Sequence, residues 1–129
     1  MSAIAYLDAS AIVRLVIDEP ESQGLLRWYH ESERVVTSRI GVVETRRAVA
    51  RRDHDPDHLS AVLDRVEVFE LDEEIGRRAG GITPSSIRTL DAIHIATALA
   101  IPAIDAFVTY DDRQAAAARS AGLPVVRPA

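Results

Sequence analysis

The sequence has 129 residues, 47% of them hydrophobic and 27% charged, a balance typical of a folded globular protein rather than a disordered chain. It contains no cysteine, which excludes disulfides, cysteine-ligated zinc and thiol catalysis. All 15 basic residues are arginine, so no lysine can serve as a base, form a Schiff base or bind a phosphate. The length suits one hydrophobic core, and we predict a single domain over residues 1–129.

The formal net charge of −5 by itself argues against a nucleic-acid-binding protein, because such proteins usually present a basic face. The objection is weaker if several acidic residues lie together in one metal site. Bound divalent cations would then cancel much of the negative charge. A metal-dependent nuclease can therefore have an acidic sequence.

The N-terminal segment MSAIAYLDAS lacks the basic stretch and the following apolar stretch of a signal peptide. No apolar run in the sequence is long enough to span a bilayer. We therefore expect a cytoplasmic protein with no membrane partner, and the absence of cysteine fits such a reducing compartment.

Short apolar runs alternate with helical patterns along the first half of the chain. The apolar runs predict strands at residues 3–7 and 35–37. Helices are expected at residues 10–17, from Pro20 to about residue 33, at 41–52 and at 56–65, since proline is well placed at the start of a helix.

The same alternation continues in the second half. We predict strands at residues 67–71, 106–109 and 125–127, and a loop at 83–86. Helices are expected at residues 72–79, ended by Gly80 and Gly81, at 91–100, ended by Pro102, and at 112–120, capped by Gly122. This pattern predicts the α/β class, a three-layer α/β/α sandwich with a mostly parallel central sheet.

Acidic residues stand where such a sheet places its ligands, at the carboxyl ends of strands. Asp8 ends the first predicted strand, and Asp111 follows the strand FVT. Asp91 opens the predicted helix at 91–100, and Glu44 lies in the helix after the second strand. Carboxylate oxygens are the hard ligands that Mg²⁺ and Mn²⁺ prefer, and two such ions roughly 3.5–4 Å apart can hold both the attacking water and the leaving oxygen of a phosphodiester.

A cluster of carboxylates without a cation is unfavourable. Two carboxylates about 4 Å apart repel by roughly 4 kcal/mol at an effective dielectric constant of 20. This repulsion raises pKa values and destabilises the fold, so a cluster of acids normally implies a counter-ion.

Each acid also has a simpler interpretation. Asp8 could begin a turn, with Ser10 capping the first helix, while Asp91 and Asp111 could each be a helix cap. Glu44 could form an ion pair on a solvated helix face. Its available partners are Arg47 and Arg51.

Ordered motifs along the whole chain resemble the PIN-domain family, and within it the VapC-type toxin ribonucleases of type II toxin–antitoxin systems. The motifs are YLDASAIVRL, VVETRRA, SIRTLDAIHIATAL, FVTYDD and the tail AAARSAGLPVVRP. An isolated Asp-x-Ser would mean little, but the order and spacing of this set are specific, and SIRTLDAIHIATAL is its most specific member.

The resemblance implies a PIN-like fold and assigns roles to residues of this chain. The catalytic and metal-binding residues would be Asp8, Glu44, Asp91 and Asp111, with Asp112 as a further metal ligand. Ser10 and Thr109 would orient the carboxylates from behind, and Arg88 is a candidate contact to the substrate. The implied cofactor is Mg²⁺, with Mn²⁺ as a substitute, and the implied reaction is hydrolysis of RNA by a metal-activated water.

The resemblance also implies partners. A cognate antitoxin would lay a helix or an extended tail across the toxin and block the acidic site, and the toxin would form a homodimer or a toxin–antitoxin hetero-oligomer. We expect Leu15, Leu25 and Trp28 to contribute to the antitoxin groove, with a role in the core as an equal alternative.

Several other polar residues have ordinary structural explanations. His54 and His58 fit a solvated loop, in which Asp55 or Asp57 caps the next helix. His94 fits a packed, hydrogen-bonded histidine better than a metal ligand. Arg88 could tie down its own loop instead of contacting phosphate. The arginines of the third helix fit a solvated face better than an RNA-binding one; they are Arg46, Arg47, Arg51 and Arg52.

Three other functions share features with this pattern. A phosphotransfer receiver and a haloacid-dehalogenase-like phosphatase both resemble this pattern of strand-end acids, but both rely on a lysine that the chain lacks. The remaining alternative is a catalytically silent PIN-fold binding or scaffold module. The complete set of acids argues against it, because an inactive scaffold gains nothing from carboxylates that repel one another.

Overall fold

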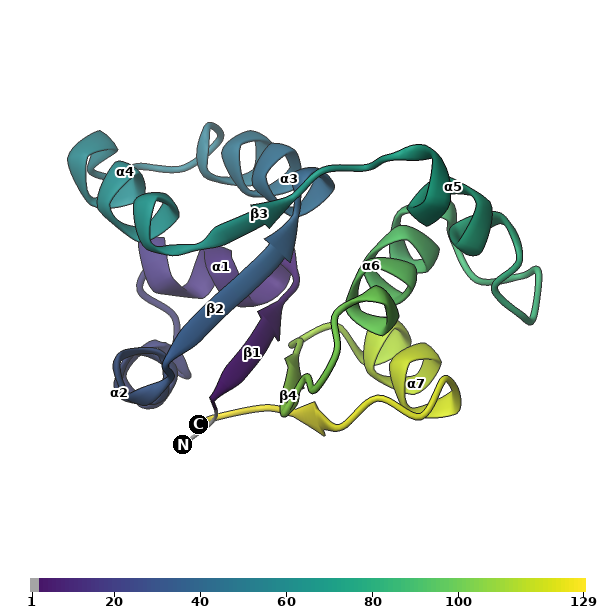
Figure 1. Cartoon of the computed structure of the whole chain (residues 1–129). Helices are drawn as coiled ribbons and strands as arrows, with labels where there is room; N and C mark the ends of the chain where they lie inside the picture. The colour runs from purple at the N-terminus through teal and green to yellow at the C-terminus, as the bar shows by residue number, and fades with distance from the viewer. Residues whose placement is uncertain (1–2) are drawn as a thin grey trace.

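A parallel sheet runs through the centre of the molecule, with helices on both of its faces (Figure 1). The computed structural model describes residues 3–129. The strands are β1 (Ile4–Leu7), β2 (Arg34–Ser38), β3 (Glu67–Phe69), β4 (Ala106–Val108) and β5 (Val125–Val126). The helices are α1 (Ala9–Val16), α2 (Ser22–Glu31), α3 (Arg39–Val49), α4 (Pro56–Arg65), α5 (Glu73–Gly80), α6 (Thr89–Ala100) and α7 (Asp112–Ser120).

The order of the strands creates a switch point in the middle of the sheet. The order is β3-β2-β1-β4-β5, and every pair is parallel. The chain first builds outward from β1 to β3 and then returns to place β4 on the other side of β1. Crossovers leave a parallel sheet in opposite directions at such a point, which opens a crevice at the carboxyl ends of the two central strands.

Alternating side chains of the strands divide the core into two layers. Ala5 and Leu7 pack on one side with residues of α1 to α4, while Tyr6 packs on the other with residues of α6 and α7. Tyr6 stacks on Phe107 of the neighbouring strand, with ring centroids 5.1 Å apart. Both faces of the sheet are therefore buried, and the predicted three-layer α/β/α sandwich is confirmed.

The predicted elements all occur, and their boundaries differ by a few residues. The helix expected from Pro20 begins at Ser22, and the helix expected from residue 91 begins at Thr89. Asp91 therefore lies in the first turn of α6, and its interpretation as the helix cap is wrong. The residue after the cap of α7, Gly122, has a φ of +86°, the left-handed conformation that glycine adopts without strain.

Two of the residues expected in the antitoxin groove belong to the core instead. Leu25 is fully buried and Leu15 is nearly so, and both pack among α1 to α4, whereas Trp28 is half-buried against the same cluster. The alternative of a core role is thus correct for Leu15 and Leu25.

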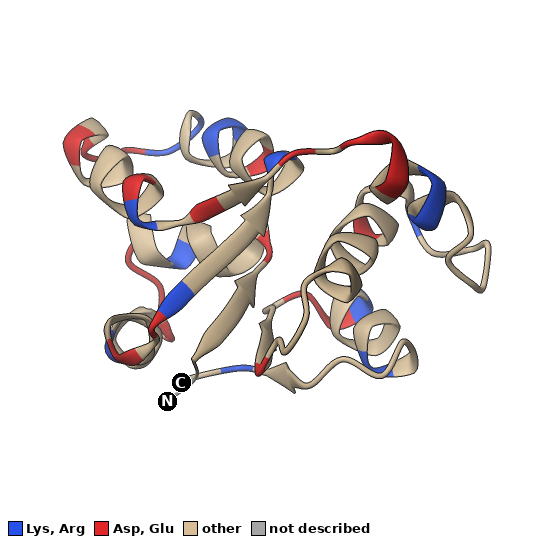
Figure 2. Cartoon of the chain, in the orientation of Figure 1, with Lys and Arg blue, Asp and Glu red and all other residues tan. Residues whose placement is uncertain are grey.

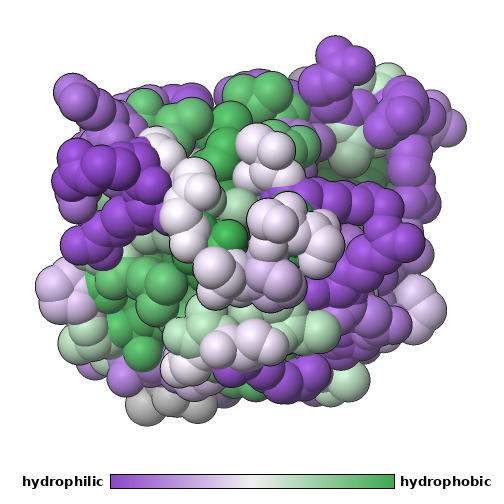
Figure 3. All heavy atoms as spheres, turned by 90° about the vertical axis from the view of Figure 1, so that its right-hand side faces the viewer, coloured by the Kyte–Doolittle hydropathy of each residue, from purple (hydrophilic) through white to green (hydrophobic). Residues whose placement is uncertain are grey.

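The surface carries mixed charges and scattered apolar residues. Acidic and basic segments alternate along the helices (Figure 2). On the side where α5, α6 and α7 lie, apolar patches are interrupted by polar ones (Figure 3). None of the helices within residues 3–129 combines the length and the apolar character needed to cross a bilayer.

Candidate active site

Asp8 is the most deeply buried acid of the predicted site. It follows β1 and caps α1, and its backbone N–H donates to the carbonyl of Val108 in β4 at 3.2 Å, which ties it to the switch point. Its Oδ1 accepts hydrogen bonds from the Ser10 hydroxyl at 2.6 Å and from the Ala11 N–H at 3.2 Å, and its Oδ2 accepts one from the Thr109 hydroxyl. With only 4% of its surface exposed, the carboxylate is held in one position by three donors.

Burial has an electrostatic cost for Asp8. The pKa of its carboxyl group is raised, because loss of solvent outweighs the opposing effects of nearby His94 and of the three hydrogen-bond donors. A nearby cation would offset this cost.

Thr109 and Ser10 link Asp8 to the segment that carries Asp111. The Thr109 oxygen, which donates to Asp8, also accepts from the Asp111 N–H at 3.1 Å, and the Ser10 oxygen accepts from the Tyr110 N–H at 2.8 Å. The ends of β1 and β4 are thereby joined through two hydroxyl groups. These hydrogen bonds support the role of both residues in orienting the carboxylates, which stays a prediction.

Asp111 is exposed and caps α7. Its Oδ1 accepts from the N–H groups of Arg113 at 2.9 Å and Gln114 at 3.1 Å. The capping interpretation is therefore correct for Asp111, and it does not compete with a role in the site, since one oxygen of the carboxylate is left without a hydrogen bond to the described residues.

Asp91, in the first turn of α6, lies within the electric field of the other acids. The pKa of its carboxyl group is raised, first by burial and then by the charge of Asp111, with smaller contributions from Asp8 and Glu44; His94 opposes them. The charges of the other three predicted acids, which lie on separate elements, all act on Asp91. That the four carboxylates form one site stays a prediction.

Glu44 contacts a histidine rather than an arginine. Its Oε1 is 2.6 Å from Nε2 of His94, whose Nδ1 is 2.6 Å from the hydroxyl of Tyr6. His94 is 2% exposed, so it is the packed, hydrogen-bonded histidine that the sequence suggested. The expected pairing of Glu44 with Arg47 or Arg51 is absent from the salt bridges of the described residues.

Within residues 3–129, Asp112 forms a salt bridge with an arginine, unlike the other predicted aspartate ligands. Its carboxylate forms a salt bridge of 2.9 Å with Arg127, and 91% of its side chain is exposed. To approach a metal ion held by the other acids, directly or through water, Asp112 would have to leave Arg127.

The acids suit a hard divalent cation in charge and donor type. Asp8, Asp91 and Asp111 form no salt bridge with any arginine of residues 3–129. Within the same residues, no group of 3 or more acidic or histidine side chains is close enough as it stands to hold one ion. The donor set fits Mg²⁺ or Mn²⁺, and binding requires the more exposed side chains to turn inward.

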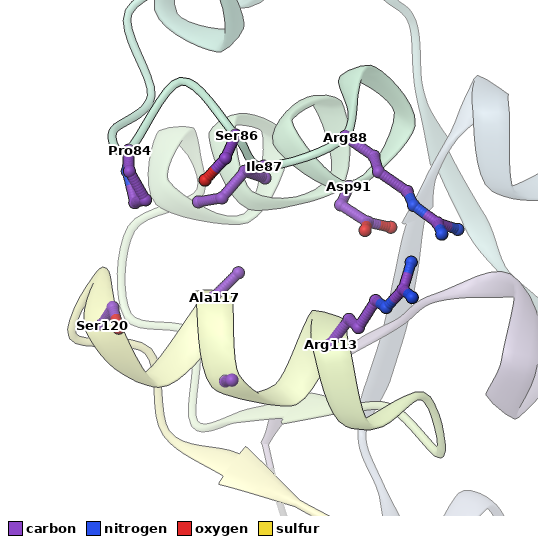
Figure 4. Close-up of a pocket in the computed structure, with 9 residues that line it drawn as sticks. Pro84, Ser86, Ile87, Arg88, Asp91, Arg113, Ala117 and Ser120 are labelled. Carbon is purple, nitrogen blue, oxygen red and sulfur yellow. The ribbon is translucent and has the colours of Figure 1, made fainter.

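Two cavities adjoin the acidic residues, one on each side of the first turn of α6. One has a volume of about 420 Å³ and lies between the loop before α6 and the helix α7, with Arg88, Asp91 and Arg113 at one end (Figure 4). The other, of about 520 Å³, lies among α1, α3 and Leu90, and includes Ser10 and Glu44.

Sequence reasoning missed some of the residues around the acids. Arg113 was overlooked, and its only signal is its place two residues after Asp111. Val43 and Leu90, 47% and 45% exposed, line the second cavity and were not singled out from the sequence. The contact of His94 with Glu44 joins residues 50 positions apart, which no local pattern reveals.

The geometry defines a class: a three-layer α/β protein with acidic residues near the switch point of its sheet. The PIN domain model matches residues 5–120. The chain is 37% identical to ribonuclease VapC46 of Mycobacterium tuberculosis over 99% of each chain, and 39% identical to ribonuclease VapC35 of the same organism over 95% of this chain and 96% of that protein.

Solved structures agree on the fold. The crystal structure of VapC20 from M. tuberculosis, a toxin that cleaves the sarcin–ricin loop, superposes with a TM-score of 0.73 at 20% identity, over 96% of this chain and 99% of that one. VapBC-1 from nontypeable Haemophilus influenzae matches with a TM-score of 0.67 at 18% identity, over 96% of this chain and 97% of that one. The chain belongs to the PIN-domain family, among the VapC ribonucleases.

Proposed function

We propose that this chain is the toxin of a toxin–antitoxin pair and that it hydrolyses RNA phosphodiester bonds. Its catalytic and metal-binding residues would be Asp8, Glu44, Asp91 and Asp111. Its VapC relatives are ribonucleases, and those of the PIN-domain type depend in general on a metal ion. The observation that carries the site assignment is the buried Asp8 carboxylate at the end of β1, which the hydroxyl groups of Ser10 and Thr109 hold in place. The pKa of Asp91 is raised, first by burial and then by the charges of the other acids. Such mutual repulsion has a clear purpose where a cation binds.

The proposed cofactor is Mg²⁺, with Mn²⁺ as a substitute. A divalent ion at these residues supplies an activated water and charge stabilisation for the leaving oxygen. Asp8 would be the fixed ligand, because Ser10 and Thr109 already hold its carboxylate in place. Asp91 and Asp111 would turn toward the ion, and Asp112 would contribute after release from Arg127.

The antitoxin would occupy the cavity of about 520 Å³ beside the acidic residues. Val43 and Leu90 expose apolar surface there, and Glu44 and Ser10 connect the cavity to the site. An apolar segment of the antitoxin would pack on Val43 and Leu90, and one of its basic side chains would reach Glu44 and Ser10. The cytoplasmic location, the single-domain organisation and a homodimer or toxin–antitoxin hetero-oligomer complete the proposal.

A catalytically silent scaffold is the alternative. The hydrogen bonds of Ser10 and Thr109 to Asp8 favour the active enzyme, because they orient a charge whose burial is unfavourable and which a scaffold does not need.

The test is cleavage of structured RNA by the antitoxin-free protein with Mg²⁺, with Mn²⁺ and with EDTA. We expect cleavage with either metal, none with EDTA, and none by Asp91→Asn. Asp64→Asn is a matched control, since Asp64 is exposed on α4 and outside the site. Equal cleavage by Asp91→Asn and the control would refute the site, and a folded wild-type protein that never cuts RNA would favour the scaffold.

A further inference from the structure

Two arginines meet at one end of the cavity between the 83–88 loop and α7. Arg88, at the start of α6, and Arg113, in the first turn of α7, extend toward one another beside the Asp91 carboxylate (Figure 4). Both residues are exposed, and neither forms a salt bridge with any residue from 3 to 129. Like charges that converge without a salt bridge to neutralise them favour an anion between them, and guanidinium groups bind phosphate with two parallel hydrogen bonds.

Beyond the arginines, the cavity is a slot with apolar walls. Pro84 and Ile87 of the loop face Ala116 and Ala117 of α7, with Ser86 and Ser120 as hydroxyl-bearing neighbours. Its volume of about 420 Å³ lies in the range of sites that enclose a small molecule, roughly 300–1,000 Å³. A flat base attached to a phosphate held by the arginines would fit between apolar walls of this kind.

We propose that this cavity is a subsite for one nucleotide of single-stranded RNA next to the bond that is cut. Arg88 and Arg113 bind its phosphate, its base enters the slot, and the serine hydroxyls contact the base edge. The inference rests on the proposed function, because it uses Asp91 as the junction between the subsite and the reacting phosphate. The two cavities are separate, since Leu90 lines the cavity among α1 and α3 and Asp91 lines this one.

The test measures the binding of a fluorescein-labelled single-stranded RNA oligonucleotide, with Ca²⁺ in place of Mg²⁺, and compares it with the rate of cleavage in Mg²⁺. Arg88→Gln and Arg113→Gln are expected to weaken binding roughly tenfold each and to reduce its dependence on salt by about one counter-ion. Arg119→Gln is the matched control, because Arg119 is exposed on the same helix and does not line the cavity. Its binding should stay at the wild-type value.

A third variant tests the slot. Ala117→Leu should narrow it, leave the salt dependence unchanged and alter the ratio of cleavage among oligonucleotides that differ in one base. Unchanged RNA binding by both arginine variants would overturn the subsite. The same variants are also tested for binding to an oligoglutamate peptide. If they lose binding to the peptide but keep binding to RNA, the arginines contact an acidic protein partner and the subsite is refuted. A wild-type protein that neither binds nor cuts RNA would instead refute the proposed function.

A second inference comes from the buried contact behind Glu44. The Tyr6 hydroxyl and Nδ1 of His94 are 2.6 Å apart, and Nε2 of His94 is 2.6 Å from Glu44 Oε1. A carboxylate only accepts hydrogen bonds, so Nε2 must carry a proton and donate it to Glu44, and in a neutral ring Nδ1 then accepts from the phenol. A single orientation of the His94 ring therefore provides a hydrogen bond to the Tyr6 hydroxyl and another to the Glu44 carboxylate.

The packing of α3 fixes this chain of hydrogen bonds. A Cβ atom at Gly41 would stand 2.4 Å from the Thr37 hydroxyl and 3.2 Å from Cε1 of His94, so only glycine lets α3 approach so closely. The Thr37 hydroxyl is itself bound to the Leu7 carbonyl at 2.7 Å. His94 is thus confined between the sheet and the helix that carries Glu44.

We infer that Tyr6 and His94 are positioning residues, which hold the half-buried Glu44 carboxylate at the edge of the acidic site. This inference rests on the proposed function as well. A group that orients a ligand in this way typically contributes 10–100-fold to activity or metal affinity.

The variants are chosen to separate orientation from folding. His94→Leu should lower kcat for RNA cleavage about 10–100-fold with little change in KM, and Tyr6→Phe should cause a smaller loss of the same kind. His94→Gln should restore part of kcat, because its amide N–H can replace the Nε2 donor. Tyr29→Phe is the control, since it removes another buried hydroxyl, bound to the Val62 carbonyl, far from the site.

A proton NMR spectrum of the metal-free protein gives a measurement independent of activity. A downfield imidazole N–H resonance is expected in the wild type and in Tyr29→Phe, and it should move upfield in Glu44→Gln. Failure to find it, or wild-type kcat in a folded His94→Leu or Tyr6→Phe protein, would overturn the positioning role. If the resonance behaves as expected but the wild type cuts no RNA, the proposed function fails while the hydrogen-bond chain stands.

Discussion

Two neighbouring strands of the sheet end in the same local pattern with different results. β1 leads into Asp8 and α1, and β4 leads into Asp111 and α7, and each aspartate caps its helix. Asp8 is buried and is held by two hydroxyl groups as well as by a backbone N–H. Asp111 is exposed and is held by backbone N–H groups alone.

The difference shows how one motif can serve two purposes. At β1, burial raises the pKa of the aspartate, and nearby His94 together with the hydrogen bonds of Ser10, Thr109 and the Ala11 N–H opposes that shift. At β4, the carboxylate stays in solvent and can turn toward a ligand while α7 remains capped. Asp8 is therefore the fixed part of the proposed site and Asp111 its adjustable part.

The largest effect should come from removing the charge of the fixed part. Asp8→Asn is expected to reduce the rate of RNA cleavage by more than about 100-fold. This exceeds the loss of roughly 10–100-fold that is typical when a group that orients a ligand is removed. Its free energy of unfolding without metal should change by less than about 1 kcal/mol, because relief of the buried charge offsets a weaker hydrogen-bond network. A thermal melt checks the fold, and collapse of the variant would instead assign Asp8 a structural role.

A smaller effect is expected from removing the Thr109 hydroxyl, which supports Asp8. Thr109→Val keeps the shape of the side chain but leaves Oδ2 of Asp8 and the N–H of Asp111 without a partner. We expect a loss of activity of about 10–100-fold and a loss of stability of about 1–3 kcal/mol. Thr97→Val removes another buried hydroxyl, bound to the Ile93 carbonyl, and should keep its activity. Equal activity of the two variants would contradict the role of Thr109.

Asp111 should separate activity from stability. Asparagine caps a helix as well as aspartate does, so Asp111→Asn should lose cleavage and keep its stability in urea. Asp111→Ala should lose cleavage and also about 1 kcal/mol of stability. If Asp111→Asn retained wild-type cleavage, the carboxylate would be a cap and nothing more.

The smallest effect concerns pH. Because burial raises the pKa values of Asp8 and Asp91 in the folded protein, the protonated forms favour folding. Their contribution to stability is present below the unfolded aspartate pKa of about 3.9 and is lost as the pH rises through the raised values. In EDTA, the wild type should therefore lose stability relative to Asp8→Asn as the pH rises above about 4. A difference that is independent of pH would contradict the burial of a charged Asp8.

Much of the fold could be predicted from local sequence. Apolar runs marked the strands, and proline and glycine marked ends such as Pro56 and Gly122. Helix starts were less certain: an acid in the first turn and an acid at the cap look alike in sequence, which explains the error at Asp91. Leu15 and Leu25 were ambiguous because an amphipathic helix does not reveal whether its apolar face meets the core or a partner.

The site was predicted only as far as its carboxylates. Their positions follow from strand ends and family motifs, but their neighbours are set by tertiary contacts. The Thr109 hydroxyl reaches Asp8 across 101 positions of the chain, and Arg113 approaches Arg88 only because α6 and α7 pack together. Contacts of this kind have no local signature, and the structure is needed to find them.

The most direct test of the central claim is the melting temperature of the antitoxin-free protein with increasing Mg²⁺ or Mn²⁺. An ion that binds only the folded state should stabilise it by about 2.7 kcal/mol at one hundred times its dissociation constant. We predict a rise in melting temperature for the wild type and for Asp64→Asn, and a much smaller rise for Asp8→Asn and Asp91→Asn. No rise at millimolar metal, or the same rise in all four proteins, would contradict a metal site built from these carboxylates.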